Sequence, residues 1–361
     1  MKKATENTTR KSEHLKIVLN KDVSHRGTTL LEMIRLFHQA IPELDLDEID
    51  LSTRFFGKSL KAPLMITSMT GGAEYSEKIN GGLAEVASEF GIAFAVGSQR
   101  VMLRRPEVIH HFAVRNHIPD GVLLGNIGAA QLIDNSIEDI VALAETIDAD
   151  GLCVHLNPGQ ELIQPHGQLK FRGIYDKLAK LVERLNGNVL VKETGAGLSP
   201  QTLNMLQKIG IKYVDVSGAG GTSWTKVESY RASTEALRRA GETFADWGIP
   251  TAPSIYAARR ILGESACVIA SGGIDTGLDS MRALAMGADV SGFARSILTS
   301  FMEKGTEGAV EYLETHLYEL KVGMLLIGAG DVKAIGKAPK LYTGELKDWI
   351  EFIDRSVKDL K

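Results

Sequence analysis

The chain has 361 residues, 44% hydrophobic and 24% charged, a composition typical of a globular protein with one large domain or two ordinary ones. Its 41 basic and 45 acidic side chains give a net charge of -4, which argues against nucleic acid or an anionic membrane as the main partner. No apolar stretch has the length of a signal peptide or a membrane helix, so we expect a cytoplasmic protein. Cys153 and Cys267 lie in apolar runs and are expected to be buried free thiols.

Residues 1–60 precede the regular part of the chain and are interpreted as an N-terminal extension. Within them, "TTRKSEH" at 8–14 places Arg10, Lys11 and His14 close together. A solvated basic tail is the ordinary interpretation of such a charge cluster.

From residue 61 onward, short and nearly continuous apolar runs alternate with helical patterns. Continuous runs of this kind are typical of parallel strands that are buried on both faces. The eight runs cover residues 63–69, 93–98, 121–127, 151–156, 188–193, 213–218, 267–273 and 290–295. Eight strand-helix units predict a (β/α)8 TIM barrel over residues 61–361, forming one catalytic domain with the extension, and a doubly wound open sheet is the alternative.

The segment 219–266, after the sixth predicted strand, is longer than a simple connection. We expect it to form a long loop or lid with a functional role. Glu228, inside this insertion, is interpreted as an ordinary surface carboxylate on sequence grounds alone. Residues 299–361 are rich in helical patterning and are expected to flank the barrel.

Every predicted strand ends in hydrogen-bonding groups. In a (β/α)8 barrel the active site gathers at these carboxyl ends, so the pattern predicts a site there. After the seventh and eighth runs, "SGGID" and "GFAR" place glycines and backbone N–H groups where barrels often bind phosphate, and Arg295 adds a fixed positive charge. "DVSGAGGTSW" at 215–224 adds glycines that permit close approach of the backbone to a ligand.

Two charged residues at strand ends need partners. Lys192 is costly to bury alone, so it should face a ligand with developing negative charge, or Glu193. Glu161, in "HLNPGQE", is either a Mg²⁺ ligand or part of a helix cap or salt bridge. Since Mg²⁺ is commonly bound by one or two carboxylates together with phosphate oxygens, a metal here implies a phosphorylated substrate.

Taken together, "RKSEH", "SMTGG", "GSQR", "GNIGAAQL", "HLNPGQE", "VKETGAGLS", "DVSGAGGTSWTKVESYR", "SGGIDTGLD" and "GADVSGFAR" resemble the type 2 isopentenyl-diphosphate isomerase family. The resemblance runs from about residue 9 to residue 300. It implies an FMN-binding barrel that requires Mg²⁺ and a reduced flavin, commonly reduced by NADPH. It also implies interconversion of isopentenyl diphosphate and dimethylallyl diphosphate through addition and removal of a proton.

The resemblance assigns roles to individual residues of this chain. Those implied to bind FMN are Thr67, Ser68, Met69, Thr70, Ser98, Asn126, Lys192, Ser217, Thr222, Gly272, Gly273, Ala294 and Arg295. Those implied to contact the diphosphate substrate are Arg10, Lys11, Ser98, Gln99, Arg100, His155, Asn157 and Gln160, and Glu161 is implied to bind Mg²⁺. For proton transfer, we hypothesise that the flavin is the principal acid and base, assisted by Gln160 or Glu228.

Other classes of protein share part of this pattern. A flavin-dependent 2-hydroxy-acid oxidase would place a histidine base after the sixth strand, where this chain reads "SGAGGTSW", and a dehydrogenase of the IMP type would place a cysteine there. A non-catalytic protein that binds a phosphorylated ligand would explain the glycine loops but not the polar groups at every strand end. We also expect a homo-oligomer, a tetramer or an octamer, in which an N-terminal arm could reach a neighbouring subunit's site.

Overall fold

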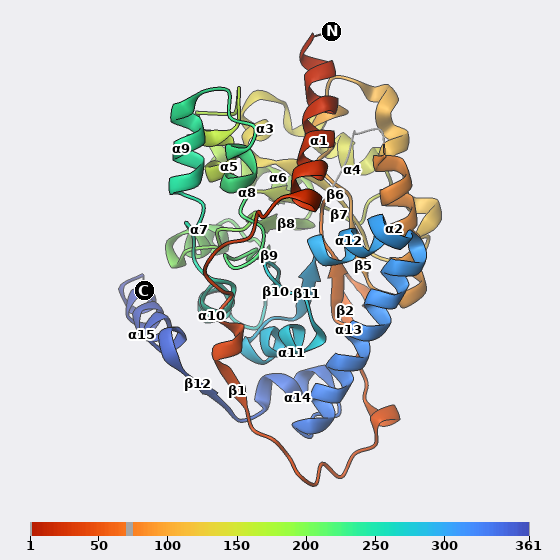
Figure 1. Cartoon of the computed structure of the whole chain (residues 1–361), viewed down its shortest axis with the longest axis vertical. Coiled ribbons are helices and arrows are strands. Elements are labelled where there is room, and N and C mark those ends of the chain that lie inside the picture. The colour runs from red at the N-terminus through yellow and green to blue at the C-terminus, as the bar shows by residue number, and fades with distance from the viewer. Residues whose placement is uncertain (1, 70–74, 361) are drawn as a thin grey trace.

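The computed structural model describes residues 2–69 and 75–360, with side chains from residue 11 onward. Its centre is a closed barrel of eight parallel strands (Figure 1). In spatial order they are β4 (Leu64–Ile66), β5 (Ala93–Ala95), β6 (Leu123–Gly128), β7 (Gly151–His155), β8 (Val189–Lys192), β9 (Tyr213–Asp215), β10 (Cys267–Ala270) and β11 (Val290–Phe293), which returns to β4. Each strand falls on one of the predicted runs, so the (β/α)8 prediction is confirmed and the open sheet is excluded.

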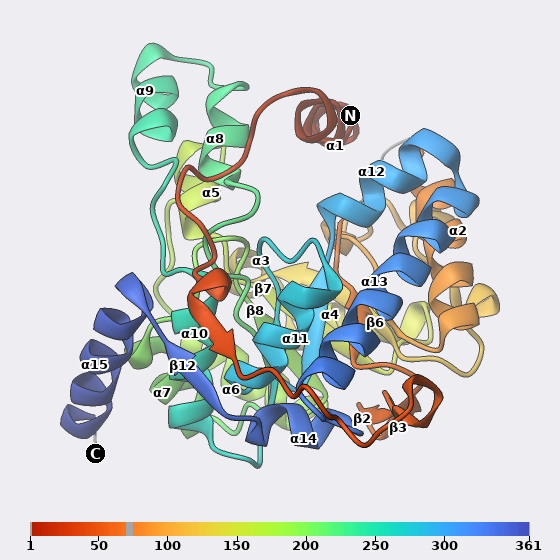
Figure 2. The same cartoon turned by 60° about the horizontal axis from the view of Figure 1, so that its bottom comes forward.

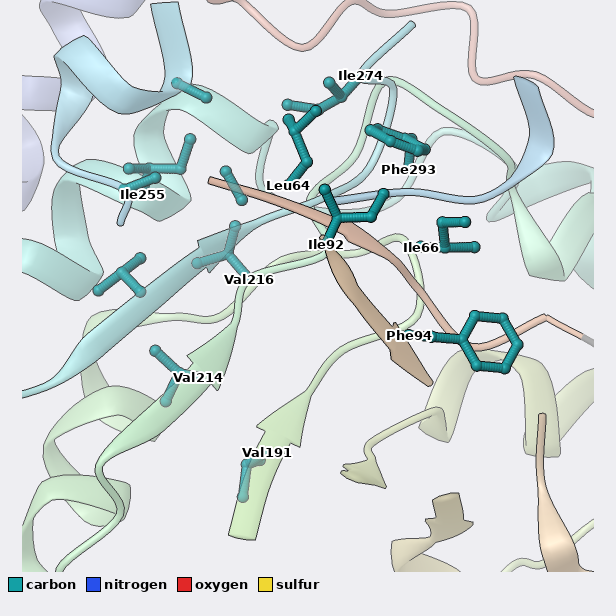
Figure 3. Close-up of a cluster of buried hydrophobic side chains, with 14 of the residues drawn as sticks. Leu64, Ile66, Ile92, Phe94, Val191, Val214, Val216, Ile255, Ile274 and Phe293 are labelled. Atoms are coloured by element: carbon teal, nitrogen blue, oxygen red, sulfur yellow. The ribbon is translucent and has the colours of Figure 1, made fainter. Parts of the chain in front are cut away.

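Side chains alternate between the two faces of each strand and so build two apolar clusters. On β8, Val189 and Val191 point outward into the cluster between strands and helices, whereas Leu190 points into the barrel. Figure 3 shows part of the outer cluster, in which Val191 and Val214 lie on neighbouring strands. The apolar runs lack a polar alternation because both faces of the sheet are covered.

Helices surround the barrel between consecutive strands. They are α2 (Ser76–Phe90), α3 (Ala129–Asp134), α4 (Ile137–Thr146), α5 (Pro158–Ile163), α6 (Ile174–Arg184), α7 (Pro200–Lys208), α11 (Gly277–Met286), α12 (Arg295–Lys304) and α13 (Thr306–Leu326). Several begin after a residue whose side chain accepts a hydrogen bond from the first turn, among them Ser136 before α4 and Ser199 before α7.

The expected insertion after the sixth strand, 219–266, is present, but it is largely helical and not a long loop. This segment forms α8 (Trp224–Ser229), α9 (Glu235–Thr243) and α10 (Thr251–Leu262). Ser223 and Thr234 accept hydrogen bonds from the first turns of α8 and α9, and these local caps favour helix. The helix α10 buries Ala252 and Ile255 in the outer cluster and is the normal barrel helix of this unit. Only α8 and α9 are therefore additional to the barrel pattern.

The remaining elements lie before β4 and after α13. They are α1 (Lys2–Asn20), β1 (Ile34–Leu36), β2 (Thr53–Phe55), β3 (Lys58–Leu60), α14 (Val332–Lys337), β12 (Lys340–Tyr342) and α15 (Gly344–Asp359). The β2–β3 hairpin contributes Phe55 and Leu60 to the cluster inside the barrel, and β1 pairs with β12 in antiparallel register. None of the described helices is long and apolar enough to cross a membrane.

Candidate active site

A cavity of about 250 Å³ opens at the carboxyl ends of the barrel strands. Its wall contains Lys11, His14, Leu15, Val18, Thr67, Ser68, Met69, Ser98, Arg100, Asn126, Gln131, His155, Asn157, Gln160, Glu161, Gln164, Lys192, Thr194, Gly195, Ser217, Gly221, Thr222, Trp224, Ser271, Gly272, Gly273, Ile274, Asp275, Gly292, Phe293, Ala294, Arg295, Ser296 and Leu298. The helix α1 lies beside α8 above this end of the barrel (Figure 2). The cavity therefore has a floor of strand ends and a wall from the N-terminal extension.

The side of the cavity at β10 and β11 has the features of an anion site. Gly272 and Gly273 adopt φ values of +97° and +69°, and a Cβ on Gly272 would lie 2.2 Å from the carbonyl oxygen of Gly218. The ten-residue helix α12 begins at Arg295, so its N-terminal N–H groups and positive dipole end lie at the cavity. The side chain of Arg295 also lines the cavity and donates to Ser24 Oγ at 3.0 Å. Phosphate is the ligand that this combination favours.

The opposite side of the barrel, at β7, carries a chain of hydrogen bonds. Asn157 Nδ2 donates to Gln160 Oε1 at 3.0 Å, and Gln160 Nε2 donates to Glu228 Oε1 at 2.9 Å. Pro158 occupies the first turn of α5, where its fixed φ suits helix initiation. Because both ends of the Gln160 amide are held, the orientation of this amide at the cavity wall is defined.

Glu228 is fully buried, so its interpretation as a surface carboxylate is wrong. Besides the bond from Gln160, its carboxylate accepts from Arg231 Nη1 at 2.7 Å and lies 2.8 Å from His14 Nε2. Burial alone would raise the pKa of the Glu228 carboxyl, but the hydrogen bonds and charges of His14, Arg231 and Gln160 outweigh it and lower the pKa. Glu228 is therefore an ionised group that links α8 to α1 and to the cavity wall.

Glu161 is also buried, at 4% exposure, yet it lines the cavity. Its Oε2 accepts from the backbone N–H of Gln168 at 2.7 Å, and its Oε1 lies 3.7 Å from Arg100 Nη1. Among the residues whose placement is described, no cluster of three or more His, Cys, Asp or Glu side chains could hold a metal ion. A cation here would thus have a single carboxylate and would need oxygens from its substrate.

The floor of the cavity contains Lys192, whose side chain is buried. Its Nζ donates to the backbone carbonyl oxygen of Glu193 at 2.7 Å. The carboxylate of Glu193 instead accepts from the backbone N–H groups of Thr194 and Ala196, both at 2.5 Å, and burial raises its pKa to about 7. The side-chain salt bridge between Lys192 and Glu193 that the sequence suggested is therefore not formed.

Further predicted residues lie at the cavity in defined positions. His155 Nδ1 and Asn126 Oδ1 are 2.9 Å apart, which joins the ends of β7 and β6. Lys11, on α1, donates to the carbonyl oxygen of Ser98 at 2.7 Å. The backbone of Ser217 has a φ of +37°, a strained value for a residue with a side chain, at the end of β9.

The structure separates one predicted substrate residue from the cavity. Gln99 is fully buried, its Oε1 accepts from the backbone N–H of Asn126 at 2.9 Å, and its Nε2 donates to the carbonyl oxygen of Leu143 at 2.7 Å. The expected side-chain contact of Gln99 with substrate is thus corrected to a structural role beneath Asn126. Thr70 and the side chain of Arg10 lie outside the described residues. The other predicted cofactor, substrate and metal residues all line the cavity.

Some cavity residues were not singled out by the sequence. Leu15 and Val18 share with Lys11 and His14 the spacing i, i+3, i+4 and i+7, so the four side chains form the inner face of α1 and the solvated-tail interpretation is wrong for this segment. The periodic apolar residues in "HLKIVL" are the signal that could have revealed this helix. Asp215 is a second omission: a carboxylate inside the apolar run of β9, buried at 1% exposure.

Sequence comparison relates the chain to a set of isomerases. Relatives named isopentenyl-diphosphate delta-isomerase include those of Ignicoccus hospitalis, 42% identical over 95% of this chain and 96% of the relative, and Pyrococcus furiosus, 39% identical over 97% and 91%. The relative of that name from Nostoc sp. is 44% identical over 84% of this chain and 87% of its own length. A family model described as FMN-dependent dehydrogenase matches residues 159–341.

Solved structures with the same fold are more distant in sequence. A flavocytochrome b2 variant superposes with a TM-score of 0.68 at 16% identity, over 92% of this chain and 83% of that chain. A mandelate oxidase variant with (S)-mandelic acid superposes with a TM-score of 0.64 at 14% identity, over 94% and 98%. These similarities establish the barrel fold and nothing more specific.

Proposed function

Because the chain belongs to the type 2, FMN-dependent isopentenyl-diphosphate delta-isomerase family, we propose that it interconverts isopentenyl diphosphate and dimethylallyl diphosphate by adding and removing a proton, with FMN and Mg²⁺. The reaction moves a double bond without net redox change. Protonation of an unactivated alkene generates positive charge on carbon, so the site must stabilise a cation and exclude water.

The residues at the cavity fit FMN. A phosphate group suits the N-terminus of α12 together with Arg295 and the backbone at Gly272 and Gly273, where a Cβ would collide with neighbouring backbone. Lys192, on the floor, supplies a positive charge for a flavin ring. Reduced FMN would supply an electron-rich surface next to the alkene and a group that exchanges a proton with it.

The residues also fit a diphosphate held through Mg²⁺. Glu161 offers a buried carboxylate, and Arg100 and Lys11 place two positive charges at the same cavity. One carboxylate is sufficient when phosphate oxygens complete the coordination. Binding energy from this anionic end is remote from the reacting carbons and serves to orient them.

For proton transfer, the described contacts support roles for Gln160 and Glu228. Gln160 is held by Asn157 and Glu228, and presents its amide to the cavity in one orientation. Glu228 is ionised and buried. Its carboxylate can accept a proton and lies one hydrogen bond behind Gln160. We assign Gln160 to contact with the reacting end of the substrate and Glu228 to assistance of proton movement through Gln160.

The observation that carries the proposal is this hydrogen-bonded chain, placed across the barrel from the anion site. The test is anaerobic incubation of the purified protein with FMN, NADPH, Mg²⁺ and isopentenyl diphosphate in D₂O. We expect dimethylallyl diphosphate that contains solvent deuterium. Bleaching of the flavin by a 2-hydroxy acid, without isomer formation, would instead identify an oxidoreductase.

The proposal extends to reductant, assembly and compartment. NADPH is the proposed source of electrons for FMN, and the chain is proposed to act as a tetramer or octamer in the cytoplasm. The contacts of α1 with Glu228 and Arg231 within one chain support the proposal that the N-terminal arm serves its own site. Size-exclusion chromatography with light scattering measures the assembly, and NADPH consumption under anaerobic conditions measures the reductant.

A further inference from the structure

Two ionisable side chains point into the barrel at its cavity end. Lys192 ends β8 and Asp215 ends β9, and they are direct partners in the register of this parallel pair. Leu190 and Tyr213, two positions earlier on each strand, belong to or pack on the cluster inside the barrel. Because side chains alternate along a strand, Lys192 and Asp215 also point inward, on strands about 4.8 Å apart.

Asp215 is only partly satisfied by hydrogen bonds. Its Oδ1 accepts from Ser271 Oγ at 2.7 Å and from the backbone N–H of Ser217 at 3.1 Å, whereas its buried Oδ2 has no hydrogen-bond partner among the described residues. A buried carboxylate oxygen without a donor is costly unless a positive charge lies close by. Burial raises the pKa of the Asp215 carboxyl, and the charge of Lys192 acts against that rise.

Other groups nearby do not supply this charge. The Cys153 thiol faces the same interior, but a thiol is neutral or negative and cannot carry a positive charge. The same holds for the Glu193 carboxyl, which accepts from the backbone of Thr194 and Ala196. Lys192 is therefore the positive charge next to Asp215. Lys192 lines the cavity, whereas Asp215 does not.

We propose that Asp215 is a positioning residue for the flavin: it is ionised opposite the Lys192 ammonium, and its charge offsets part of the positive charge that Lys192 presents to the ring. The proposal rests on the proposed function, since it requires FMN above Lys192. A positive charge below the ring favours the anionic reduced flavin, and Asp215 moderates that preference. The pair thus shifts the reduction potential of the bound flavin.

The test is the midpoint potential of FMN in the holoenzyme, measured by anaerobic titration with a redox dye. Asp215→Asn removes the negative charge with little change of side-chain volume. The ratio of reduced to oxidised FMN at a given potential should then increase by about tenfold, which is a rise of the midpoint potential of about 30 mV for a two-electron couple. Asp176→Asn, on the exposed face of α6, makes the same change of charge outside the cavity and should leave the potential unchanged. If Asp215→Asn does not fold, Asp215→Ser should shift the potential in the same direction.

A second measurement establishes whether Asp215 acts through Lys192. The shift caused by Asp215→Asn should be clearly smaller in a Lys192→Gln background, because the partner charge is then absent. An equal shift in both backgrounds, or no shift in the wild-type background, would overturn the proposal. An active isomerase with an unchanged potential refutes only this inference, whereas an inactive wild type with the expected shift refutes the proposed function and leaves the inference standing.

Discussion

Glu161 and Glu228 are both buried carboxylates near α5, yet their surroundings assign them different chemistry. The negative charge of Glu228 is balanced by ion pairs with Arg231 and His14, so its carboxylate oxygens already have partners other than a metal ion. Glu161 lies at the cavity with Arg100 at 3.7 Å as its positive neighbour. Of the two, only Glu161 can offer a carboxylate oxygen to a cation held by a diphosphate.

The substitution Glu161→Gln tests this difference. It keeps the size of the side chain but removes the charge that a hard cation prefers, so the Mg²⁺ concentration for half-maximal activity should rise by about tenfold or more. Glu183→Gln, exposed on α6, is the matched control and should behave as wild type. Full activity of Glu161→Gln at low Mg²⁺ would exclude Glu161 as the ligand.

His316 provides a pH-dependent contribution to stability. It lies on α13, is 1% exposed, and its Nε2 is 2.7 Å from Ser280 Oγ on α11. Burial lowers the pKa of the His316 imidazole to about 4, from 6.5. In that interval the unfolded chain binds the proton and the folded chain does not, so stability falls as pH falls from 6.5 to 4.

We therefore expect His316→Gln to flatten the acid branch of the stability curve. Between pH 6.5 and pH 4, His316 alone should lower the free energy of unfolding of the wild type by on the order of 3 kcal/mol, and the variant should not show this contribution. Urea unfolding at several pH values measures the difference. His110→Gln, at an exposed histidine, is the control, and parallel slopes for all three proteins would contradict the assignment.

At the scale of the element, α1 is held to the barrel by both its polar and its apolar faces. Glu13 lies 2.9 Å from Arg231, and His14 lies 2.8 Å from Glu228, both on the segment that begins with α8. Leu15 and Val18 complete the wall of the cavity. The helix thus contacts Glu228, one of the two residues that hold Gln160.

Leu15→Asp should release this helix. A carboxylate at this position would be desolvated against the cavity wall, so docking of α1 becomes unfavourable. We expect the KM for isopentenyl diphosphate to rise by on the order of tenfold, with faster proteolysis within residues 2–20, because Lys11 leaves the site with the helix. Lys16→Glu introduces a carboxylate on the exposed side of α1, and an equal effect there would show that any added negative charge suffices.

At the scale of the whole molecule, the proposed FMN would have its phosphate at β10 and β11 and its ring over β8. Binding at both should stabilise the fold by mass action, by about 2.7 kcal/mol at a ligand concentration of one hundred times Kd. Riboflavin, which lacks the phosphate, should raise Tm much less than FMN at equal concentration. Equal shifts for the two ligands in a thermal denaturation experiment would mean that the glycine loops do not bind the phosphate.

The fold was largely predictable because it depends on local patterns. Each strand is a continuous apolar run, and Ser136 and Ser199 mark helix starts, so these elements could be located from local patterns, whereas such patterns do not distinguish a closed barrel from an open sheet. Burial of Glu228 could not be predicted, since it requires residues 14 and 231 to meet around it. Gln99 is buried whereas Arg100 lines the cavity, although both belong to one 3-10 turn. Adjacent side chains in such a turn point in different directions, and sequence spacing alone does not reveal which one faces the cavity.

The pairing of β1 with β12 has a mechanical consequence. Ile34 pairs with Tyr342 and Leu36 with Lys340, so the chain ends leave the pair from the same side, at Ile34 and Tyr342. Tension applied to the two ends would open this short ladder like a zipper, one rung after another, instead of shearing all its rungs together. Tension at the termini would therefore first detach α1 from α8 and α15 from α10, and would then open this ladder before it loads the eight parallel strands of the barrel.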